Sequence, residues 1–223
     1  LESSATASSS PFDLSNQYAA ALNIYSADEI GENKDMLIQK LAWTYDALYQ
    51  YSDVETIPVR IYLANTDLTN TKDGWIPEEQ LTLVYDGINY FVPGQKNIIS
   101  FDLDTPFEYD NTQSLCIVTF RSGTRPAMFG CSWRTFNAEG GTYRSMHESQ
   151  NTPYNGTNCW AEDQVPVLYM AFDKYVGIKD INVSEENNEN APVYNLNGQY
   201  VGNSTKLLKA GIYIQGGKKI VVK

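Results

Sequence analysis

The sequence has little of the material from which catalytic and metal sites are usually built. It contains a single histidine, His147, and only three cysteines, Cys116, Cys131 and Cys159. Neither CxxC nor HxxxH spacing occurs, so the pattern supports no structural zinc site and implies no cofactor. A cysteine nucleophile would need His147 as its base, and this residue is predicted to lie in a surface loop. A Cys/His enzyme is therefore not expected.

Positive charge is also scarce. Lysine and arginine number 16 against 27 aspartate and glutamate residues, which gives a formal net charge of -11. Nucleic acid and anionic membrane surfaces both require a basic footprint, so neither is an expected partner. A glycosidase needs two carboxylates beside one cleft, but so many acidic residues leave any such pair unrecognisable. A hydrolase is accordingly the least favoured function class.

Long hydrophobic runs are missing too, so no membrane insertion is expected. The chain does not open with a signal peptide either. Residues 1–16 are rich in serine, which is typical of a spacer, and we predict a flexible lead there. One explanation is that a leader or an upstream domain has been removed.

What the sequence does contain is a set of short apolar runs. They cover 58–63, 81–85, 98–103 and 115–120, with glycine and proline turns between them. The first three alternate with period two: Val59, Ile61 and Leu63 form one face and Arg60 and Tyr62 the other. The fourth is apolar at nearly every position, as in a strand covered on both faces. The pattern predicts an all-β, jelly-roll-like antiparallel β-sandwich.

The flanking segments extend this sandwich over residues 17–175. The alanine-rich stretch 18–25 is compatible with a helix or with a strand. Residues 37–45 predict a strand with Leu41, Trp43 and Tyr45 on one face, and 165–172 a last strand. Alternation is weak from 123 to 164, which indicates a loop-rich segment, the part of a β scaffold that often carries function.

One connection invites a metal hypothesis. Asn65, Asp67 and Asp73 offer oxygen atoms, which calcium prefers. The spacing does not match an EF-hand loop, and Asn and Asp are ordinary turn formers. We therefore interpret residues 65–77 as turns and expect no metal.

Residues 176–223 differ in character. An acidic, asparagine-rich stretch at 183–191 is typical of a linker. Two hairpins are predicted after it, one around Asn197 and Gly198 and one around Gly216 and Gly217. A linker and a small C-terminal β-hairpin module are expected.

Two parts of the chain resemble known families. Residues 192–199, 211–214 and 217–223, with their Asn-Gly turn, Gly-Ile-Tyr and Gly-Lys-Lys, resemble the C-terminal sorting-type (type IX secretion-like) domain of Bacteroidetes secreted and surface proteins. Residues 60–66, 75–77, 81–87, 101–102, 106–109 and 144–146 resemble jelly-roll domains of adhesin-like proteins of the same bacteria. These resemblances imply an exported, secreted or cell-surface protein.

The loop-rich segment holds the residues that we single out for binding. They are two tryptophans, two arginines and two tyrosines: Trp133, Arg134, Tyr143, Arg144, Tyr154 and Trp160. Aromatic rings can stack on sugar faces and arginine can donate hydrogen bonds to hydroxyl groups. The alternative, that Trp133 and Trp160 cap the core, is favoured. Cys131 and Cys159 could pair in an oxidising compartment, although free thiols are the more natural reading.

The function that the sequence favours is a non-catalytic adhesion or carbohydrate-binding-like module. Its partner would be a glycan or a host or cell-surface protein. The alternative is a structural accessory or sorting domain of a larger exported protein, with no ligand of its own. Nothing in the sequence indicates an oligomeric state.

Overall fold

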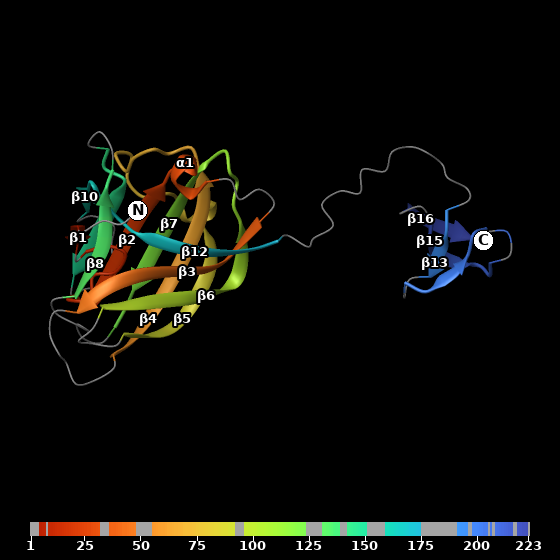
Figure 1. Cartoon of the computed structure of the whole chain (residues 1–223), viewed down its shortest axis with the longest axis horizontal. Coiled ribbons are helices and arrows are strands. Elements are labelled where there is room, and N and C mark those ends of the chain that lie inside the picture. Colours follow the sequence, from red (N-terminus) through yellow and green to blue (C-terminus); the bar gives the residue numbers. More distant parts are fainter. Residues whose placement is uncertain are drawn as a thin grey trace. The chain divides into compact units, whose positions relative to one another are not determined.

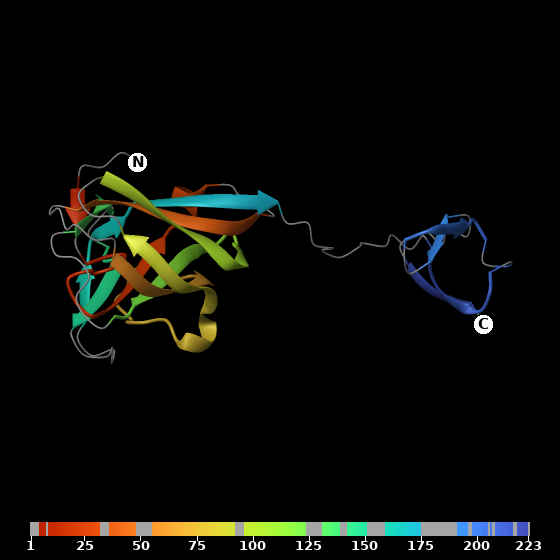
Figure 2. The same ribbon diagram turned by 90° about the horizontal axis from the view of Figure 1, so that it is seen from below.

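A computed structural model gives the arrangement of the chain. It describes residues 5–7, 9–31, 36–47, 55–91, 96–123, 131–138, 142–150, 159–174, 191–195, 198–204, 206, 208–215 and 218–222. The chain divides into two compact units, Leu1–Tyr175 and Val176–Lys223. The first unit is a sandwich of two antiparallel sheets (Figures 1 and 2). The predicted all-β class and the antiparallel sandwich are confirmed.

The two sheets of the first unit are named here from the view of Figure 1. The front sheet contains β1 (Ala5–Ala7), β3 (Met36–Ala47), β6 (Lys96–Glu108), β8 (Cys131–Asn137), β11 (Gln164–Pro166) and β12 (Leu168–Lys174). The back sheet has the order β10 (Trp160–Glu162), β9 (Ser145–Gln150), β2 (Tyr18–Tyr25), β7 (Ser114–Arg121), β4 (Glu55–Thr66) and β5 (Thr82–Phe91). Short helices α1 (Ala27–Ile30) and η1 (Glu78–Gln80) lie in the connections. No helix among the described residues is long and apolar enough to cross a membrane.

Successive strands cross repeatedly from one sheet to the other. β2 lies in the back sheet, β3 in the front sheet, β4 and β5 in the back sheet, β6 in the front sheet and β7 in the back sheet. Strands that are neighbours in the sequence therefore mostly lie in opposite sheets of the sandwich.

The core between the sheets follows from the period of two along each strand. Leu41, Trp43 and Tyr45 of β3 are all buried on one face, as predicted. From the back sheet, Ile61 and Leu63 of β4 face them in the same cluster. Because alternate side chains of a strand point to opposite faces, each strand supplies one apolar row to this core.

The alanine-rich stretch 18–25 is a strand, β2, paired with β7 on one side and with β9 on the other. Its alanines at 19–21 are buried. Alanine favours helix in isolation, but the hydrogen bonds and packing offered by two neighbouring strands outweigh that preference.

The strand β7 is buried on both faces, as its uninterrupted apolar run predicted. Leu115 and Ile117 belong to the core between the sheets. Cys116 and Val118 belong to a second cluster on the outer side of the back sheet. Another segment of the chain must therefore cover Cys116 and Val118 on the outer face of the back sheet.

The prediction of a flexible lead at residues 1–16 is wrong for the part that the structure describes. β1 pairs with β8, with Ala5 opposite Thr135. Phe12 and Leu14 are each 1% exposed in the core. The Ser10 hydroxyl donates to the Asn23 side chain at 2.8 Å. Buried serines are tolerated here because they are hydrogen-bonded, and the two apolar side chains anchor the segment.

The segment 123–164 is more regular than predicted. It contains β8, β9 and β10, while 124–130, 139–141 and 151–158 lie outside the described residues. In β8, Cys131, Trp133 and Thr135 are buried and the residues between them are less so. The alternation was present but was obscured by a polar residue, Thr135, on the inward face.

The second unit contains the two predicted hairpins. Its sheet has the order β14 (Tyr200–Gly202), β13 (Val193–Asn195), β15 (Gly211–Gln215) and β16 (Lys218–Val222). β13 pairs antiparallel with β14, and β15 pairs antiparallel with β16. Gly198, in the first turn, has a φ of 75°, a conformation that glycine adopts without strain.

Candidate functional site

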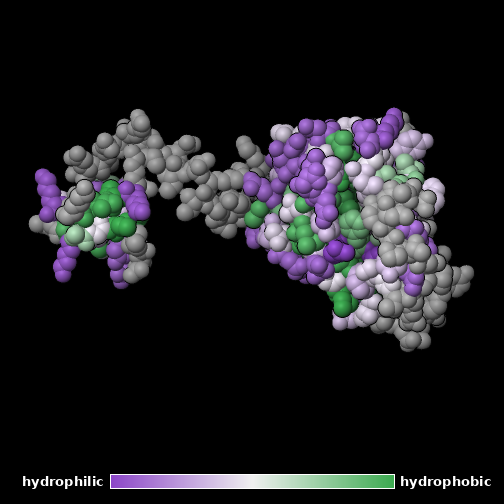
Figure 3. Space-filling model, turned by 180° about the vertical axis from the view of Figure 1, so that it is seen from behind, coloured by the Kyte–Doolittle hydropathy of each residue, from purple (hydrophilic) through white to green (hydrophobic). Residues whose placement is uncertain are grey.

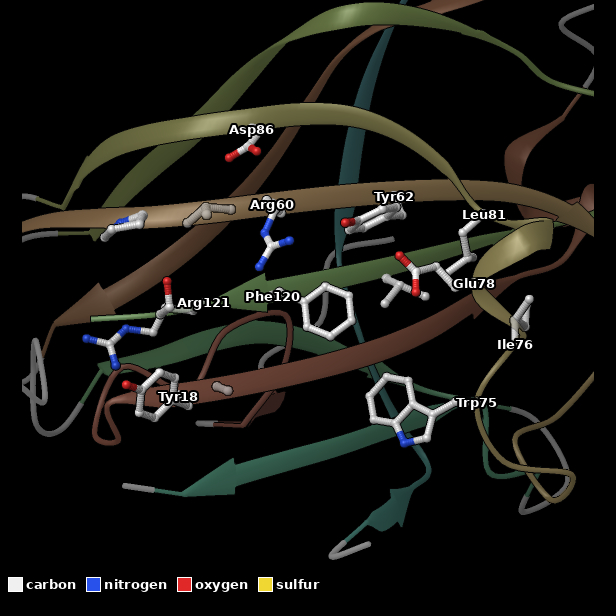
Figure 4. Close-up of a pocket in the computed structure, with 15 residues that line it drawn as sticks. Tyr18, Arg60, Tyr62, Trp75, Ile76, Glu78, Leu81, Asp86, Phe120 and Arg121 are labelled. Atoms are coloured by element: carbon white, nitrogen blue, oxygen red, sulfur yellow. The ribbon is translucent and has the colours of Figure 1, made fainter. Parts of the chain in front are cut away.

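A pocket of about 520 Å³ lies on the outer face of the back sheet. Figure 3 views the molecule from the back, where a band of hydrophobic residues runs beside hydrophilic ones. The pocket is lined by Tyr18 and Ala19 of β2, Pro58, Val59, Arg60 and Tyr62 of β4, Asp86 of β5, Val118, Phe120 and Arg121 of β7, and by Ser122, Trp75, Ile76, Glu78 and Leu81. Strands from the sheet thus form its floor, and the connection from β4 to β5 forms a wall (Figure 4).

The wall exists because the β4–β5 connection folds back over the sheet. Ile76 is buried there in one cluster with Cys116 and Val118 of β7, and Trp75 and Leu81 pack against that cluster. We call this the outer cluster; its buried members are Leu22, Ile24, Ala64, Ile76, Cys116, Val118 and Met146. Burial of these apolar side chains holds the connection on the sheet.

Hydrogen bonds fix the connection further. Thr71 donates to the Tyr143 carbonyl oxygen from its backbone nitrogen at 2.7 Å and from its hydroxyl at 3.0 Å. The Trp75 indole nitrogen donates to the Cys159 sulfur at 3.0 Å. The wall is therefore preformed, which favours ligand binding because less entropy is lost on association.

Two of the three residues suggested as calcium ligands have other partners for a side-chain oxygen. The Asn65 side-chain oxygen accepts a hydrogen bond from the Asp110 backbone nitrogen at 2.8 Å. An Asp67 carboxylate oxygen accepts one from the Gln113 amide at 2.9 Å. Among the described residues, no group of three His, Cys, Asp or Glu side chains is placed to hold a metal ion.

Two aromatic rings form the centre of the floor. Tyr62 of β4 and Phe120 of β7 meet edge to face, with ring centroids 5.6 Å apart and planes at 84°. Both side chains are half-buried, so part of each ring is accessible from the pocket. An edge-to-face pair is rigid and presents apolar area without needing to be ordered on binding. Trp75 faces them from the wall (Figure 4).

Charged groups surround these rings. Arg60 extends over the floor towards Phe120, its neighbour in the β4–β7 register, and Glu78 lies on the wall (Figure 4). Asp86 is the partner of Arg60 in the β4–β5 register. Among the described residues, none forms a hydrogen bond or an ion pair with the Arg60 guanidinium. Its donors are available to a ligand.

Trp133, in contrast, is not a surface residue. It is fully buried in the core, with its ring 5.5 Å from that of Tyr45 and 5.7 Å from that of Phe12. Its indole nitrogen donates to the Phe12 carbonyl oxygen at 2.7 Å. The binding hypothesis is wrong for Trp133, because the strand β8 turns it inward, and its role is the alternative one, packing the core.

The two predicted arginines have partners of their own. Arg144 forms a bidentate ion pair with Glu29, each nitrogen–oxygen distance being 2.7 Å, and its guanidinium lies 5.6 Å from the centre of the Phe136 ring. Burial acts to raise the pKa of Glu29, but hydrogen bonds from Arg144 and Ser26, with the arginine charge, hold it below its usual value. Arg134 lies on the front sheet, 3.8 Å from an Asp46 carboxylate oxygen. Neither arginine lines the pocket on the back sheet.

The remaining predicted residues are dispersed as well. Trp160 is 53% exposed and stacks on His147, its partner in the β9–β10 register, at 5.6 Å. Met146, next to His147, faces the outer cluster, so alternation directs His147 and Trp160 to the opposite side of the sheet from the pocket. Tyr143 is exposed. Tyr154 lies outside the described residues. The five predicted residues that the structure describes do not form a single site.

The cysteines are free thiols. Cys131 lies in the core between the sheets, where burial, with a smaller effect of Asp46 and Asp13, raises the pKa of its thiol to about 12. Cys159 packs on the outer cluster instead. Because the back sheet lies between these two locations, Cys131 and Cys159 do not pair in this fold.

The sequence contained two separate signals for the pocket, and neither alone indicated a binding site. Arg60 and Tyr62 form the outward row of an alternating strand, and the uninterrupted apolar run of β7 implies a covered outer face. The connection before β5, with its Trp75 and Ile76, supplies that cover. No protein-family model matches the chain, and no curated protein shows significant sequence similarity to it.

Proposed function

We propose that the sandwich unit is a non-catalytic carbohydrate-binding module that serves in adhesion at a bacterial cell surface or after secretion. The observation that carries this proposal is the pocket in which the Tyr62 and Phe120 rings lie beside the guanidinium of Arg60, which has no partner among the described residues. A sugar ring offers an apolar face and a rim of hydroxyl groups. The aromatic floor of the pocket matches the apolar face of the sugar, and the charged groups around the floor match its hydroxyl groups.

The composition of the pocket indicates which class of ligand fits. Arg60 can donate hydrogen bonds to hydroxyl groups, and the Glu78 and Asp86 carboxylates can accept them. Positive and negative groups are both present, so the pocket does not select strongly for a charged ligand. Its open position on a sheet face suits weak binding, on the order of micromolar to millimolar dissociation constants.

The test is a glycan array probed with the full chain, followed by titration of each hit against isotope-labelled protein by NMR. We expect a limited set of glycans to bind and to shift backbone signals of 58–62 and 118–122. Should no glycan bind on the array or in solution, carbohydrate binding is rejected and a structural accessory role takes its place. Binding that shifts only signals of the front sheet would reject this pocket.

A second role concerns the C-terminal unit. We infer that Val176–Lys223 acts as a sorting-type module of an exported protein. Two observations support this inference: the residue pattern from Pro192 to Lys223, and the two hairpins that place this pattern in a separate small sheet. Expression in a bacterium with type IX secretion provides the test. The full chain with a leader should reach the cell surface, and the same chain without 176–223 should not.

A further inference from the structure

The face that holds the pocket continues beyond it along β4 and β5. In the β4–β5 register, Arg60 pairs with Asp86, then Pro58 with Ile88, and then Thr56 with Tyr90. The residues between these on β4, Ile57 and Val59, are buried in the core. Because side chains alternate along a strand, the paired residues form one row on the outer face. We call Thr56, Pro58, Ile88 and Tyr90 the outer track.

The outer track is apolar and accessible. Ile88 is 59% exposed and Tyr90 is 62% exposed, and these are among the largest exposures of big hydrophobic side chains in the unit. They are two residues apart on one strand and therefore project side by side. The track is continuous with the pocket, since Pro58 and Asp86 line the pocket while their neighbours Ile88 and Tyr90 extend it.

The back sheet becomes narrower at Pro58, and the chemistry of proline explains why. β7 pairs with β4 only from Val59 onward. Pro58 comes next, and its carbonyl oxygen still accepts a hydrogen bond from the Ser122 backbone nitrogen at 3.2 Å. Because proline has no backbone N–H, it cannot donate the return hydrogen bond, and the pairing with β7 ends there. Beyond it, β4 and β5 are the described strands that carry the outer track, and β5 is the edge strand of the sheet. No described strand covers the track at its side or at its end.

The dimensions then indicate the length of the ligand. From Asp86 to Tyr90 the strand advances roughly 13 Å, at about 3.3 Å per residue. This length is added to the pocket itself and exceeds the size of one hexose ring. An exposed tyrosine at the far end supplies a flat apolar surface like that of the pocket floor.

We propose that the site takes an internal stretch of a linear polysaccharide, with one sugar unit in the pocket at Tyr62 and Phe120 and later units along the outer track to Tyr90. This inference rests on the proposed function and adds the ligand class: a chain of several sugar units bound in its middle, not a terminal monosaccharide. Because no described strand covers the side or the end of the track, the polysaccharide can continue past the described part of the sheet.

The experiment compares ligand lengths on the full chain by isothermal titration calorimetry. The probes are disaccharides and hexasaccharides of linear β-linked glucose, xylose, mannose and N-acetylglucosamine. For the sugar that binds, we expect the hexasaccharide to bind at least about tenfold more tightly than the disaccharide. Tyr90→Ala should remove most of this gain and leave disaccharide binding unchanged, and Ile88→Thr should act in the same direction.

A matched control separates the track from the rest of the surface. Tyr169→Ala removes a tyrosine of similar exposure, 52%, from the front sheet, and should change neither affinity. Equal affinities for the short and long probes, or an equal loss in Tyr90→Ala and Tyr169→Ala, would overturn the track while leaving the pocket intact. If neither length of any probe binds and the glycan array is also empty, the proposed function itself fails.

Discussion

The indole nitrogen of Trp133 donates a hydrogen bond to the backbone carbonyl oxygen of Phe12, with 2.7 Å between the two atoms. Trp133 comes from the middle of β8, and Phe12 from the segment before β2. Their rings also touch, with centroids 5.7 Å apart. A residue from the beginning of the chain is thereby locked into the centre of the core, next to Phe91 and Phe101.

This contact predicts that the first segment is required for stability. Phe12→Ala should lower the free energy of unfolding by about 3–5 kcal/mol, because it leaves a cavity among aromatic side chains. Chemical denaturation followed by tryptophan fluorescence gives the value. Tyr169→Ala, which removes an exposed ring, should change it by less than about 0.5 kcal/mol. If the Phe12→Ala protein were as stable as the parent, the first segment would not be anchored in the core, and the prediction of a flexible lead would stand.

The ion pair of Glu29 with Arg144 predicts a dependence on pH. The pKa of Glu29 is lower in the folded chain than its usual value of 4.5. Its contribution is therefore complete above about pH 4.5 and is lost as the pH falls through the lower, folded value. Glu29→Gln should cost about 1–3 kcal/mol at pH 7 and much less near pH 3. Asp28→Asn removes a carboxylate from the same short helix that takes no part in this ion pair, and it serves as the control variant. A constant difference at all pH values would contradict the ion pair.

His147 offers a second titration, and as the only histidine it gives a single pair of imidazole C–H signals in proton NMR. Burial lowers its pKa, while the charges of Glu162 and Asp13 act in the opposite direction, and the net result lies below 6.5. The unfolded chain then binds the proton more tightly, so stability should fall as the pH is lowered from 6.5 towards the folded pKa. His147→Phe should remove this slope. A measured pKa above 6.5 would show that the carboxylates outweigh burial.

Because the chain divides into two compact units, we predict that the second unit, Val176–Lys223, can be removed without unfolding the first. Truncation after Tyr175 should leave a soluble sandwich whose melting temperature falls only modestly. The acidic stretch 183–191 supports this boundary, since such sequence buries little apolar surface. Circular dichroism and thermal unfolding of the truncated chain provide the check. A molten or insoluble product would mean that the tail belongs to the core.

Much of the scaffold was predictable because it depends on local patterns. The alternation of Val59, Ile61 and Leu63 predicted both the strand and its buried face, and the apolar run of β7 predicted cover on both sides. The hairpin around Gly198 followed from an Asn-Gly turn. Each of these signals lies within a few residues of the sequence.

The site was not predictable in the same way, because contacts between distant segments create it. The outer cluster brings together Ile76 from a connection, Met146 from β9 and Val118 from β7. No local pattern states that these three residues meet. Trp133 misled for a related reason: the loop-like composition around it concealed a strand, and the partner that buries it, Phe12, lies in a segment that resembled a spacer.

The most direct measurement is the affinity of a glycan-array hit for the parent chain and for two variants, each with its melting temperature. Tyr62→Ala removes a ring from the pocket floor, and Trp160→Ala removes an exposed ring from the opposite side of the same sheet. With sugar bound in the pocket, Tyr62→Ala should weaken binding by at least about tenfold, and Trp160→Ala should leave it unchanged. Arg60→Gln should also weaken it, whereas Lys40→Gln, an equal change of charge on the front sheet, should not. Loss of binding in Trp160→Ala with full binding in folded Tyr62→Ala and Arg60→Gln would contradict the pocket as the ligand site.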